Sequence, residues 1–336
     1  MLQNEPLSLQ AAPPFDEDTY ARADWLELYT TLNKVTYYTD IERVWERSRQ
    51  SENEDYAGEH ETTFDAWLEE VIAIIQYRSS VMGGDYPFAI NDDDSGVVFI
   101  TEDELSTGQA VYLLCLFLSV MNEGTIFANL LEISPRHRDL FQACSAWAAA
   151  GAIHGSSYAF GWPRPDKTRF HDALKKVFHD LMNDGDAEVH ENAPAGASPS
   201  DKDGGIDVIA WKRRLDGYAG KPIIIGQVAS GANWRDKSVK EYIERLIKNW
   251  FSRQPSTECT PAIFIPFPIR PEDGVTVGEQ VRYWSAQFGH IYYRDVIPTY
   301  AANGVTLSAN DASIFCDRLA DQAELSLAVN DLLDKV

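Results

Sequence analysis

Two neighbouring apolar segments constrain the fold of this 336-residue chain more than any other feature. The first, residues 206–211, carries Asp207 near its start, and the second, residues 222–228, carries Gln227 near its end. Such short runs, rich in Ile and Val and bounded by Gly, Pro and charged residues, are typical of buried β-strands. Because side chains alternate along a strand, each segment presents one polar residue on an otherwise apolar face. The residues expected on these faces are Asp207, Ile209 and Trp211 in the first strand and Ile223, Ile225, Gln227 and Ala229 in the second.

From about residue 161 onward, helical patterns alternate with short apolar strands. We expect helices at residues 169–182, 237–251, 277–288 and 309–336, and further strands at residues 187–190, 262–267 and 290–294. Residues 191–202 are rich in Pro, Gly and Ser, which predicts a loop. This order predicts an α/β fold with a central mixed sheet flanked by helices.

The part of the chain before residue 159 has a different pattern. Helical spacing of apolar residues recurs at residues 19–32, 39–49, 63–78, 105–123 and 135–152, with one short extended segment at residues 96–101. We therefore expect two domains. Residues 1–158 form a mainly α-helical region for partner binding or regulation, and residues 159–336 form the α/β core with a C-terminal helix.

Several features indicate a cytoplasmic protein that does not enter a membrane. The longest apolar run, residues 110–121, is shorter than the roughly 18 residues that span a bilayer. The first residues show no basic segment followed by an apolar one, so secretion is not expected. The four cysteines are widely spaced, which favours reduced, buried thiols over a disulfide framework or a zinc site.

The net charge of −23 is unevenly distributed along the chain. Residues 161–253 contain 16 Lys and Arg against 14 Asp and Glu, a net charge of +2, so the remainder carries −25. A strongly acidic surface repels phosphate, which disfavours nucleic-acid binding outside this segment. The acidic remainder has two interpretations: a solvated surface that aids solubility, or a surface that faces a partner or limits non-specific DNA binding.

Asp207 requires a compensating charge, because an aspartate buried among Ile and Trp side chains is costly without one. That charge is a divalent metal ion or a basic residue such as Arg235. Gln227 is a second, weaker oxygen ligand or a buried amide bonded to neighbouring backbone. Asp203 is a further ligand or shapes the turn at Asp203-Gly-Gly. One or two acids together with substrate phosphate suffice to hold Mg²⁺.

The order of elements and the placement of Asp207 and Gln227 resemble the PD-(D/E)xK, or restriction-endonuclease-like, nuclease superfamily over roughly residues 161–300. In that family an aspartate begins the second core strand, an acid or glutamine lies late in the third, and a lysine follows two residues later. Here Ala229 stands in the lysine position. The family also places this lysine on the following helix, where Lys237 opens the expected helix and Lys240 lies one turn further on. The string from Gln227 to Lys237 also resembles a pattern in defence-associated bacterial proteins.

The resemblance implies a metal-dependent endonuclease that hydrolyses phosphodiester bonds with Mg²⁺ or Mn²⁺. DNA is the favoured substrate, antiviral defence the expected context, and the chain is expected to act with a protein partner or as a homo-oligomer. It implies the catalytic residues Asp207, Gln227 and Lys237, and the metal ligands Asp207, Gln227 and Asp203. The alternative is a catalytically degenerate nuclease fold that serves as a scaffold or nucleic-acid-binding subunit.

Substrate contacts are expected from basic and aromatic residues near these strands, because phosphate contacts come mainly from Lys and Arg. The candidates are Arg164, Arg169, Trp234, Arg235 and Lys240. Trp234 stacks on a base or fills a gap in the core, and burial in the core is the more frequent outcome for a tryptophan. Lys212-Arg-Arg214 is interpreted as an exposed hairpin turn.

Overall fold

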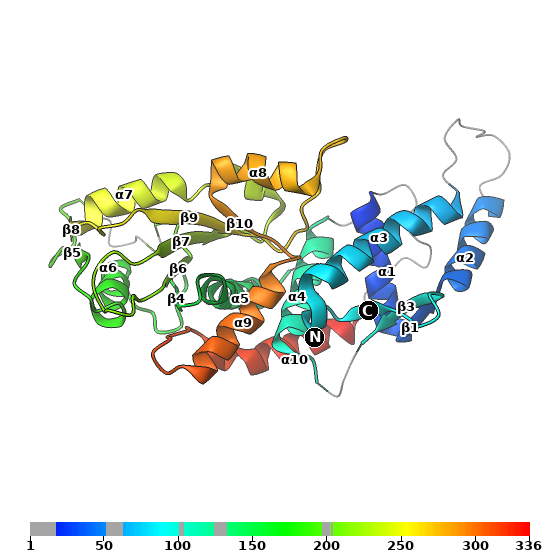
Figure 1. Ribbon diagram of the computed structural model, residues 1–336, viewed down its shortest axis with the longest axis horizontal. Helices are drawn as coiled ribbons and strands as arrows, with labels where there is room; N and C mark the ends of the chain where they lie inside the picture. The colour runs from blue at the N-terminus through cyan, green and yellow to red at the C-terminus, as the bar shows by residue number, and fades with distance from the viewer. Residues whose placement is uncertain (1–17, 52–62, 101–103, 124–132, 197–201, 203) are drawn as a thin grey trace, which may run out of the picture. The chain divides into compact units, whose positions relative to one another are not determined.

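The computed structural model describes residues 18–51, 63–100, 104–123, 133–196, 202 and 204–336 (Figure 1). The chain divides into two compact units. Unit 1 comprises Met1–Ser134 and Leu325–Val336, and unit 2 comprises Pro135–Glu324. The predicted division between residues 158 and 159 therefore differs from the division in the structure. Residues 135–158 belong with unit 2 because they supply a helix and an edge strand to its sheet.

Unit 1 combines helices with a small antiparallel sheet. Its helices are α1 (Thr19–Asn33), α2 (Tyr38–Ser51), α3 (Phe64–Met82), α4 (Thr107–Glu123) and most of α10 (Gln322–Leu333). Its strands are β1 (Val35–Tyr37), β2 (Phe88–Ile90) and β3 (Gly96–Phe99), in the order β1-β3-β2. The side chains of Asp18 and Thr63 accept hydrogen bonds from backbone N–H groups at the starts of α1 and α3, which stabilises both helix ends.

A fully buried polar network lies inside unit 1. Arg78 on α3 donates to Asp24 Oδ1 at 2.7 Å and to Glu27 Oε1 at 2.5 Å. Tyr86 and Tyr112 donate their hydroxyl protons to Glu27 at 2.5 and 2.6 Å. Burial, together with the Glu27 carboxylate, raises the pKa of Tyr86 well above its ordinary value, so the phenol stays protonated and donates.

Unit 2 is built on a five-stranded mixed sheet. Its strands are β4 (Ser156–Ala159), β6 (Val208–Trp211), β7 (Ile223–Val228), β9 (Cys259–Phe264) and β10 (His290–Tyr292). They lie in the order β10-β9-β7-β6-β4. The pairs β4–β6 and β6–β7 are antiparallel, whereas β7–β9 and β9–β10 are parallel. A separate two-stranded pair joins β5 (Glu188–Val189) to β8 (Phe251–Arg253).

Helices cover both faces of this sheet. In Figure 1, α7 (Lys240–Trp250) and α8 (Val277–Phe288) lie along one face, and α5 (Pro135–Ile153) and α9 (Ile297–Asn310) lie along the other. Alternate residues of β6 and β7 pack in one apolar core with α6 (Phe170–Lys175) and α7. The α5 and α9 backbones approach closely at Gly151 and Gly304, where a Cβ atom would collide with the facing helix. The predicted α/β class, with a central mixed sheet flanked by helices, is confirmed.

Several element boundaries differ from the predictions. The edge strand β4 was not expected, because its Ser-Ser-Tyr-Ala sequence lacks a strong apolar alternation. The strand expected at residues 187–190 forms as β5 but lies outside the main sheet. The helix expected at residues 169–182 is α6 followed by a π-helical stretch, Lys176–Leu181. The helix expected to open at Lys237 begins at Lys240. The terminal helix expected at residues 309–336 is limited to α10, and α9, which ends at Asn310, was not expected.

Among the described residues, no helix combines the length and apolar character needed to span a bilayer.

Candidate active site

Asp207 and Gln227 lie near the same end of the antiparallel pair β6–β7. Val208 pairs with Gly226 in the antiparallel register of β6 and β7, and the Asp207 N–H donates to the Gly226 carbonyl at 2.9 Å. The paired register ends at Val208, so Asp207 lies one residue before β6, and Gln227 is the second-last residue of β7. The backbone pairing thus brings both polar residues found in the sequence to one end of the β6–β7 pair.

Three strands hold Asp207 in place. Its Oδ2 accepts a hydrogen bond from the Val228 N–H at 2.8 Å. Its carbonyl oxygen accepts from the N–H groups of Phe160 and Gly161 at 2.7 and 3.0 Å. The side chain is half-buried. The carboxylate is thus fixed relative to the ends of β4 and β7, as a catalytic or ligating group requires.

Gln142, on α5, is a polar residue of this region that the sequence analysis did not identify. A Cβ atom added to Gly161 would collide with Gln142 Nε2 and would lie 2.6 Å from Asp207 Oδ1. The amide and the carboxylate therefore converge on the space left by the missing Gly161 side chain. No local pattern relates residue 142 to residue 207, because they meet only once α5 and β4 are packed against β6. Gly161, two residues after the end of β4, is the one signal in the sequence, and β4 was not predicted.

Gln227 contributes an amide oxygen with no hydrogen-bond partner among the described residues. The Oε1 atom is buried, and the side chain as a whole is partly exposed. Leaving a buried acceptor unsatisfied costs about 1–3 kcal/mol. Of the two sequence interpretations, a buried amide bonded to neighbouring backbone does not describe this oxygen. The geometry instead leaves an acceptor available to a cation or to a hydrogen-bond donor from a ligand.

Ala229, in the position where the resemblance expects lysine, lies inside the core. It is fully buried with Trp234 and Ile263, and its N–H donates to the Phe264 carbonyl at 2.9 Å. Here β7 continues beside β9 into a packed apolar cluster, so this position faces core side chains. A lysine acting with Asp207 therefore has to come from elsewhere in the chain.

Lys237 lies in an extended conformation between a short 3₁₀ helix, Ala232–Asp236, and α7. Its side chain is partly exposed and makes no hydrogen bond or ion pair with any described residue. Lys240 differs, because its ammonium donates to the Ala286 carbonyl on α8 at 2.5 Å. Of the two lysines considered from the sequence, Lys237 is therefore the one whose ammonium has no partner among the described residues.

Trp234 fills the core, and its neighbour Arg235 lies over it. Trp234 is 3% exposed and packs edge-on against Trp284 with ring centroids 5.0 Å apart. Its ring faces are not available to a base, which corrects its assignment as a nucleic-acid-binding residue. The Arg235 guanidinium lies 4.8 Å from the Trp234 ring and 5.1 Å from the Trp284 ring. Arg235 thus stacks on the two tryptophans and does not pair with Asp207, and it remains exposed.

Arg164 has a structural role in place of the expected phosphate contact. It is 2% exposed and donates to the carbonyl groups of Phe160, Thr168 and Lys202, at 2.9 Å for Thr168 and 2.8 Å for Lys202. Phe160 and Thr168 each lie four residues from Arg164, whereas Lys202 lies 38 residues away, and the sequence pattern could not show this distant contact. Arg169, just before α6, is exposed and remains available to phosphate.

The Gly204-Gly205 pair is required by close packing. Both residues have positive φ, and a Cβ atom on Gly205 would lie 2.7 Å from the Tyr242 ring of α7. The segment leading to Asp207 therefore passes directly under α7. Asp203, the third predicted ligand, lies outside the described residues.

Lys176, the first residue of the π-helical stretch after α6, pairs with the loop that follows Gly161. Its ammonium pairs with Asp166 Oδ2 at 2.9 Å. Burial alone would raise the pKa of Asp166, but hydrogen bonds from Thr168 and the Lys176 charge outweigh it and lower that pKa to about 2. The pair is therefore ionised at neutral pH, and Lys176 is committed.

The donor set at this end of the sheet fits a hard divalent cation only with help from a substrate. The described residues contain no group of three or more His, Cys, Asp or Glu side chains able to hold a metal ion. Mg²⁺ retains several waters and is often held by one or two carboxylates plus substrate phosphate. The Asp207 carboxylate and the unsatisfied Gln227 oxygen meet that smaller requirement.

Comparison with known proteins does not assign the chain to a family. No family model matches it, and neither the curated proteins nor the solved structures contain a match.

Proposed function

We propose that unit 2 is a restriction-endonuclease-like core that hydrolyses phosphodiester bonds of nucleic acid, with DNA as the favoured substrate. The observation that carries the proposal is the buried, unsatisfied Gln227 oxygen at the same end of the β6–β7 pair as the Asp207 carboxylate. A charged oxygen ligand and an amide oxygen without a partner among the described residues, both at this end, would suit a magnesium or manganese ion shared with a phosphate.

The order of elements in unit 2 supports the proposal. Helix α5 precedes three strands, β4, β6 and β7, joined as consecutive antiparallel neighbours, and α7 then leads to β9, parallel to β7. The resemblance expected a helix, three strands, a helix and a strand, beginning with the helix at residues 169–182. In the structure such a series begins earlier, at α5 and β4, and α6 and β5 are inserted between β4 and β6.

Each residue of the site would have a distinct role. A bound divalent cation supplies Lewis acidity and a more acidic water for attack on phosphorus. Asp207 and Gln227 would hold this cation. Lys237, a compact charge on a flexible stem, would offset charge developing on the phosphate oxygens. The exposed Arg235, kept in one orientation by its stacking on Trp234 and Trp284, would contact a flanking phosphate.

The test is a cleavage assay with the purified full-length chain. Plasmid, linear duplex, single-stranded DNA and RNA are incubated with Mg²⁺, Mn²⁺ or EDTA. Asp207→Asn keeps an oxygen that can accept from Val228 but removes the charge, so we expect cleavage to fall at least about 100-fold with little change in stability. We expect Lys237→Met to fall by a similar factor. Asp236→Asn, a neighbouring exposed carboxylate, is the matched control and should retain full activity.

The burial of Ala229 favours a second candidate, a degenerate nuclease fold that binds nucleic acid without cleaving it. The same samples distinguish the two. Cleavage that persists in Asp207→Asn contradicts the site assignment. A wild-type chain that binds labelled DNA but does not cut it with either metal ion supports the binding subunit.

A further inference from the structure

The connection between β6 and β7 presents the most exposed large apolar side chains in the described part of the chain. Residues 212–219 are all exposed, with Leu215 at 110% and Tyr218 at 74% of their reference areas. We call residues 212–219 the hairpin tip. It lies at the opposite end of β6 and β7 from Asp207 and Gln227. A single exposed leucine is ordinary, so the argument depends on how the tip is held.

The tip is held in one conformation by its own polar groups. Arg214 donates to both oxygens of Asp216, at 2.9 and 2.5 Å, and Asp216 also accepts from the Tyr218 N–H at 3.2 Å. These bonds, that from Arg214 foremost, lower the pKa of Asp216 to about 2, so the pair stays ionised. Gly217, with φ of +74°, closes the turn by donating to the Arg214 carbonyl at 3.1 Å. Leu215 and Tyr218 are thereby presented outward.

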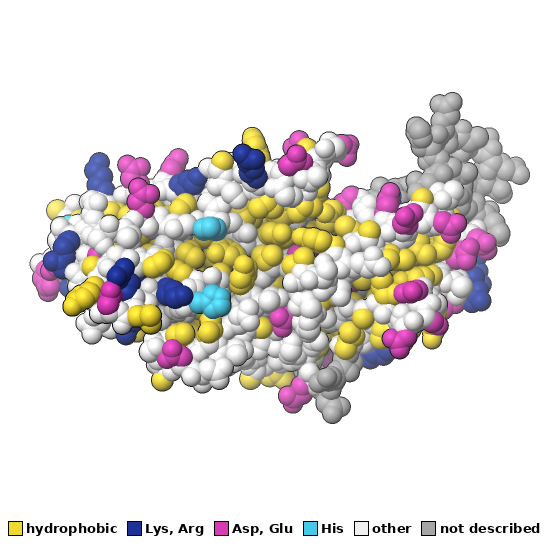
Figure 2. Space-filling view, in the orientation of Figure 1, with side chains coloured by type: hydrophobic (Ala, Val, Ile, Leu, Met, Phe, Trp, Pro, Cys, Tyr) yellow, Lys and Arg dark blue, Asp and Glu magenta, His cyan; other side chains and the backbone are white. Residues whose placement is uncertain are grey.

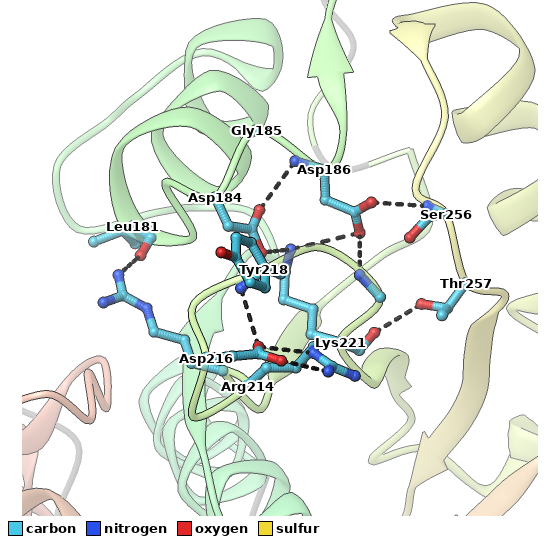
Figure 3. Close-up of polar contacts among 12 residues, drawn as sticks. Leu181, Asp184, Gly185, Asp186, Arg214, Asp216, Tyr218, Lys221, Ser256 and Thr257 are labelled. Atoms are coloured by element: carbon cyan, nitrogen blue, oxygen red, sulfur yellow. Dashed lines mark hydrogen bonds and ion pairs between the residues drawn. The ribbon is translucent and has the colours of Figure 1, made fainter.

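A buried ion-pair cluster anchors the base of the tip (Figure 3). The Lys221 ammonium, 1% exposed, contacts the carboxylates of Asp184 and Asp186. Asp186 also accepts from the Ser256 N–H at 3.1 Å, and Thr257 donates to the Lys221 carbonyl at 2.7 Å. Anchoring of this kind reduces the entropy lost when a loop docks on a partner.

The charge of the tip indicates the chemistry of its partner. Lys212, Arg213 and Arg214 outweigh Asp216, so the tip carries an excess of two positive charges around two apolar side chains. A nucleic acid fits poorly, because Arg214 is already paired and the Asp216 carboxylate and Leu215 would face phosphates. An acidic protein surface with apolar side chains fits better, since Tyr and Arg are enriched at the centres of protein interfaces.

Unit 1 of the chain has the composition that such a surface requires. Unit 1 contains 7 Lys and Arg against 28 Asp and Glu, a net charge of −21, whereas unit 2 contains 22 against 24, a net charge of −2. On the face drawn in Figure 2, Asp and Glu side chains predominate over the elements of unit 1, and most Lys and Arg side chains lie over unit 2. Unit 1 also exposes apolar side chains, among them Leu32, Tyr37 and Ile100.

We propose that the hairpin tip of one copy docks on the acidic unit 1 of a second copy. The two surfaces differ, so the contact is heterologous and builds closed rings or open chains according to the rotation between copies. Apolar burial of Leu215 and Tyr218 supplies the attraction at the centre, and the positive charges around them favour the acidic partner surface. This assembly does not depend on nuclease activity, and its test is independent of the cleavage assay.

The experiment is sedimentation velocity of the full-length chain from about 1 to about 100 µM, at about 50 mM and about 500 mM salt. We expect association that grows with concentration and weakens at high salt. Leu215→Ser combined with Tyr218→Ser should weaken association at least tenfold, about the effect of losing one interface anchor. Tyr283→Ser, an equally exposed aromatic residue on α8, is the matched control and should associate like the wild type.

A mixing experiment tests whether the tip docks on a different surface of the second copy. The Leu215/Tyr218 double variant has lost its tip anchors but keeps its unit 1. Labelled double variant should therefore bind the tip of unlabelled wild type, while failing to associate with itself. Unchanged thermal melting of the double variant shows that it is folded. A monomeric wild type across the whole range, or association unaffected by the double variant, overturns the proposal. So does a double variant that loses DNA binding but associates normally, because nucleic acid would then be the partner of the tip.

Discussion

Gly161 is the residue on which the geometry of the candidate site most directly depends. Its missing side chain leaves the space where the Gln142 amide and the Asp207 carboxylate approach each other. Its N–H also donates to the Asp207 carbonyl at 3.0 Å, so the backbone and the open space act together. A side chain added at residue 161 would therefore displace both the Gln142 amide on α5 and the Asp207 carboxylate before β6.

We expect Gly161→Ala to displace both side chains. The added methyl group would collide with Gln142 and lie 2.6 Å from Asp207 Oδ1, which costs about 1–3 kcal/mol of stability as overpacking. A shift of about 1 Å in a reacting group can lower activity about 100-fold. Urea unfolding and the cleavage assay measure the two effects. The control is Gly278→Ala on α8, where a Cβ atom meets nothing within 4 Å. Its cleavage rate should be unchanged, and its stability should be equal or higher by up to about 1 kcal/mol, because alanine favours a helix more than glycine does. A Gly161→Ala variant with wild-type cleavage would show that this space has no part in the reaction.

In unit 2, a buried ion-pair cluster holds the loop before β5 against the start of β7. Lys221, at the start of the β7 segment, lies between Asp184 and Asp186, which come from the loop before β5. The alternation of apolar residues identified β6 and β7, but it did not show which loops pack at their far end. That packing depends on one lysine meeting two carboxylates about 35 residues away in the sequence.

Removing the central ammonium should be more damaging than removing an exposed one. Lys221→Met keeps the length of the side chain but leaves two carboxylates facing each other with no cation. We expect a loss of about 3–5 kcal/mol, the usual cost of breaking a buried ion pair from one side. Urea unfolding measures it, with the exposed Lys248→Met as the matched control, expected to change stability by less than about 0.5 kcal/mol. A loss below about 1 kcal/mol would mean that the two aspartates relax into solvent.

Over the whole molecule, each of the two units contains a buried charge cluster of its own. Unit 1 depends on Arg78 between Asp24 and Glu27, and unit 2 on its five-stranded sheet. Almost all of the net charge belongs to unit 1. Damage to one cluster should therefore appear first in its own unit.

We expect Arg78→Met to destabilise unit 1 by about 3–5 kcal/mol, because two buried carboxylates lose the guanidinium that pairs with both of them. Hydrogen exchange should then speed up in α1, α3 and α4, while the strands of unit 2 keep their protection. Arg43→Met is the control, since its pair with Asp40 is exposed and contributes at most about 1 kcal/mol. Equal loss of protection in both units would show that they unfold as one cooperative body.

The amino-acid sequence was enough to predict the strands β6, β7, β9 and β10, the α/β class, and the position of Asp207 and Gln227 at the ends of two neighbouring strand segments. These depend on alternation and turn chemistry, which act over a few residues and are visible in a short window. The edge strand β4, the approach of Gln142 and the burial of Arg164 were decided only by the tertiary structure. Each requires pairing between segments distant in the chain, and no local pattern encodes which segments meet. The same reason applies to Ala229 and to Lys237. Only the assembled sheet and helices show that Ala229 packs in one apolar cluster with Trp234, and that Lys240 is hydrogen-bonded whereas the Lys237 ammonium has no hydrogen bond to any described residue.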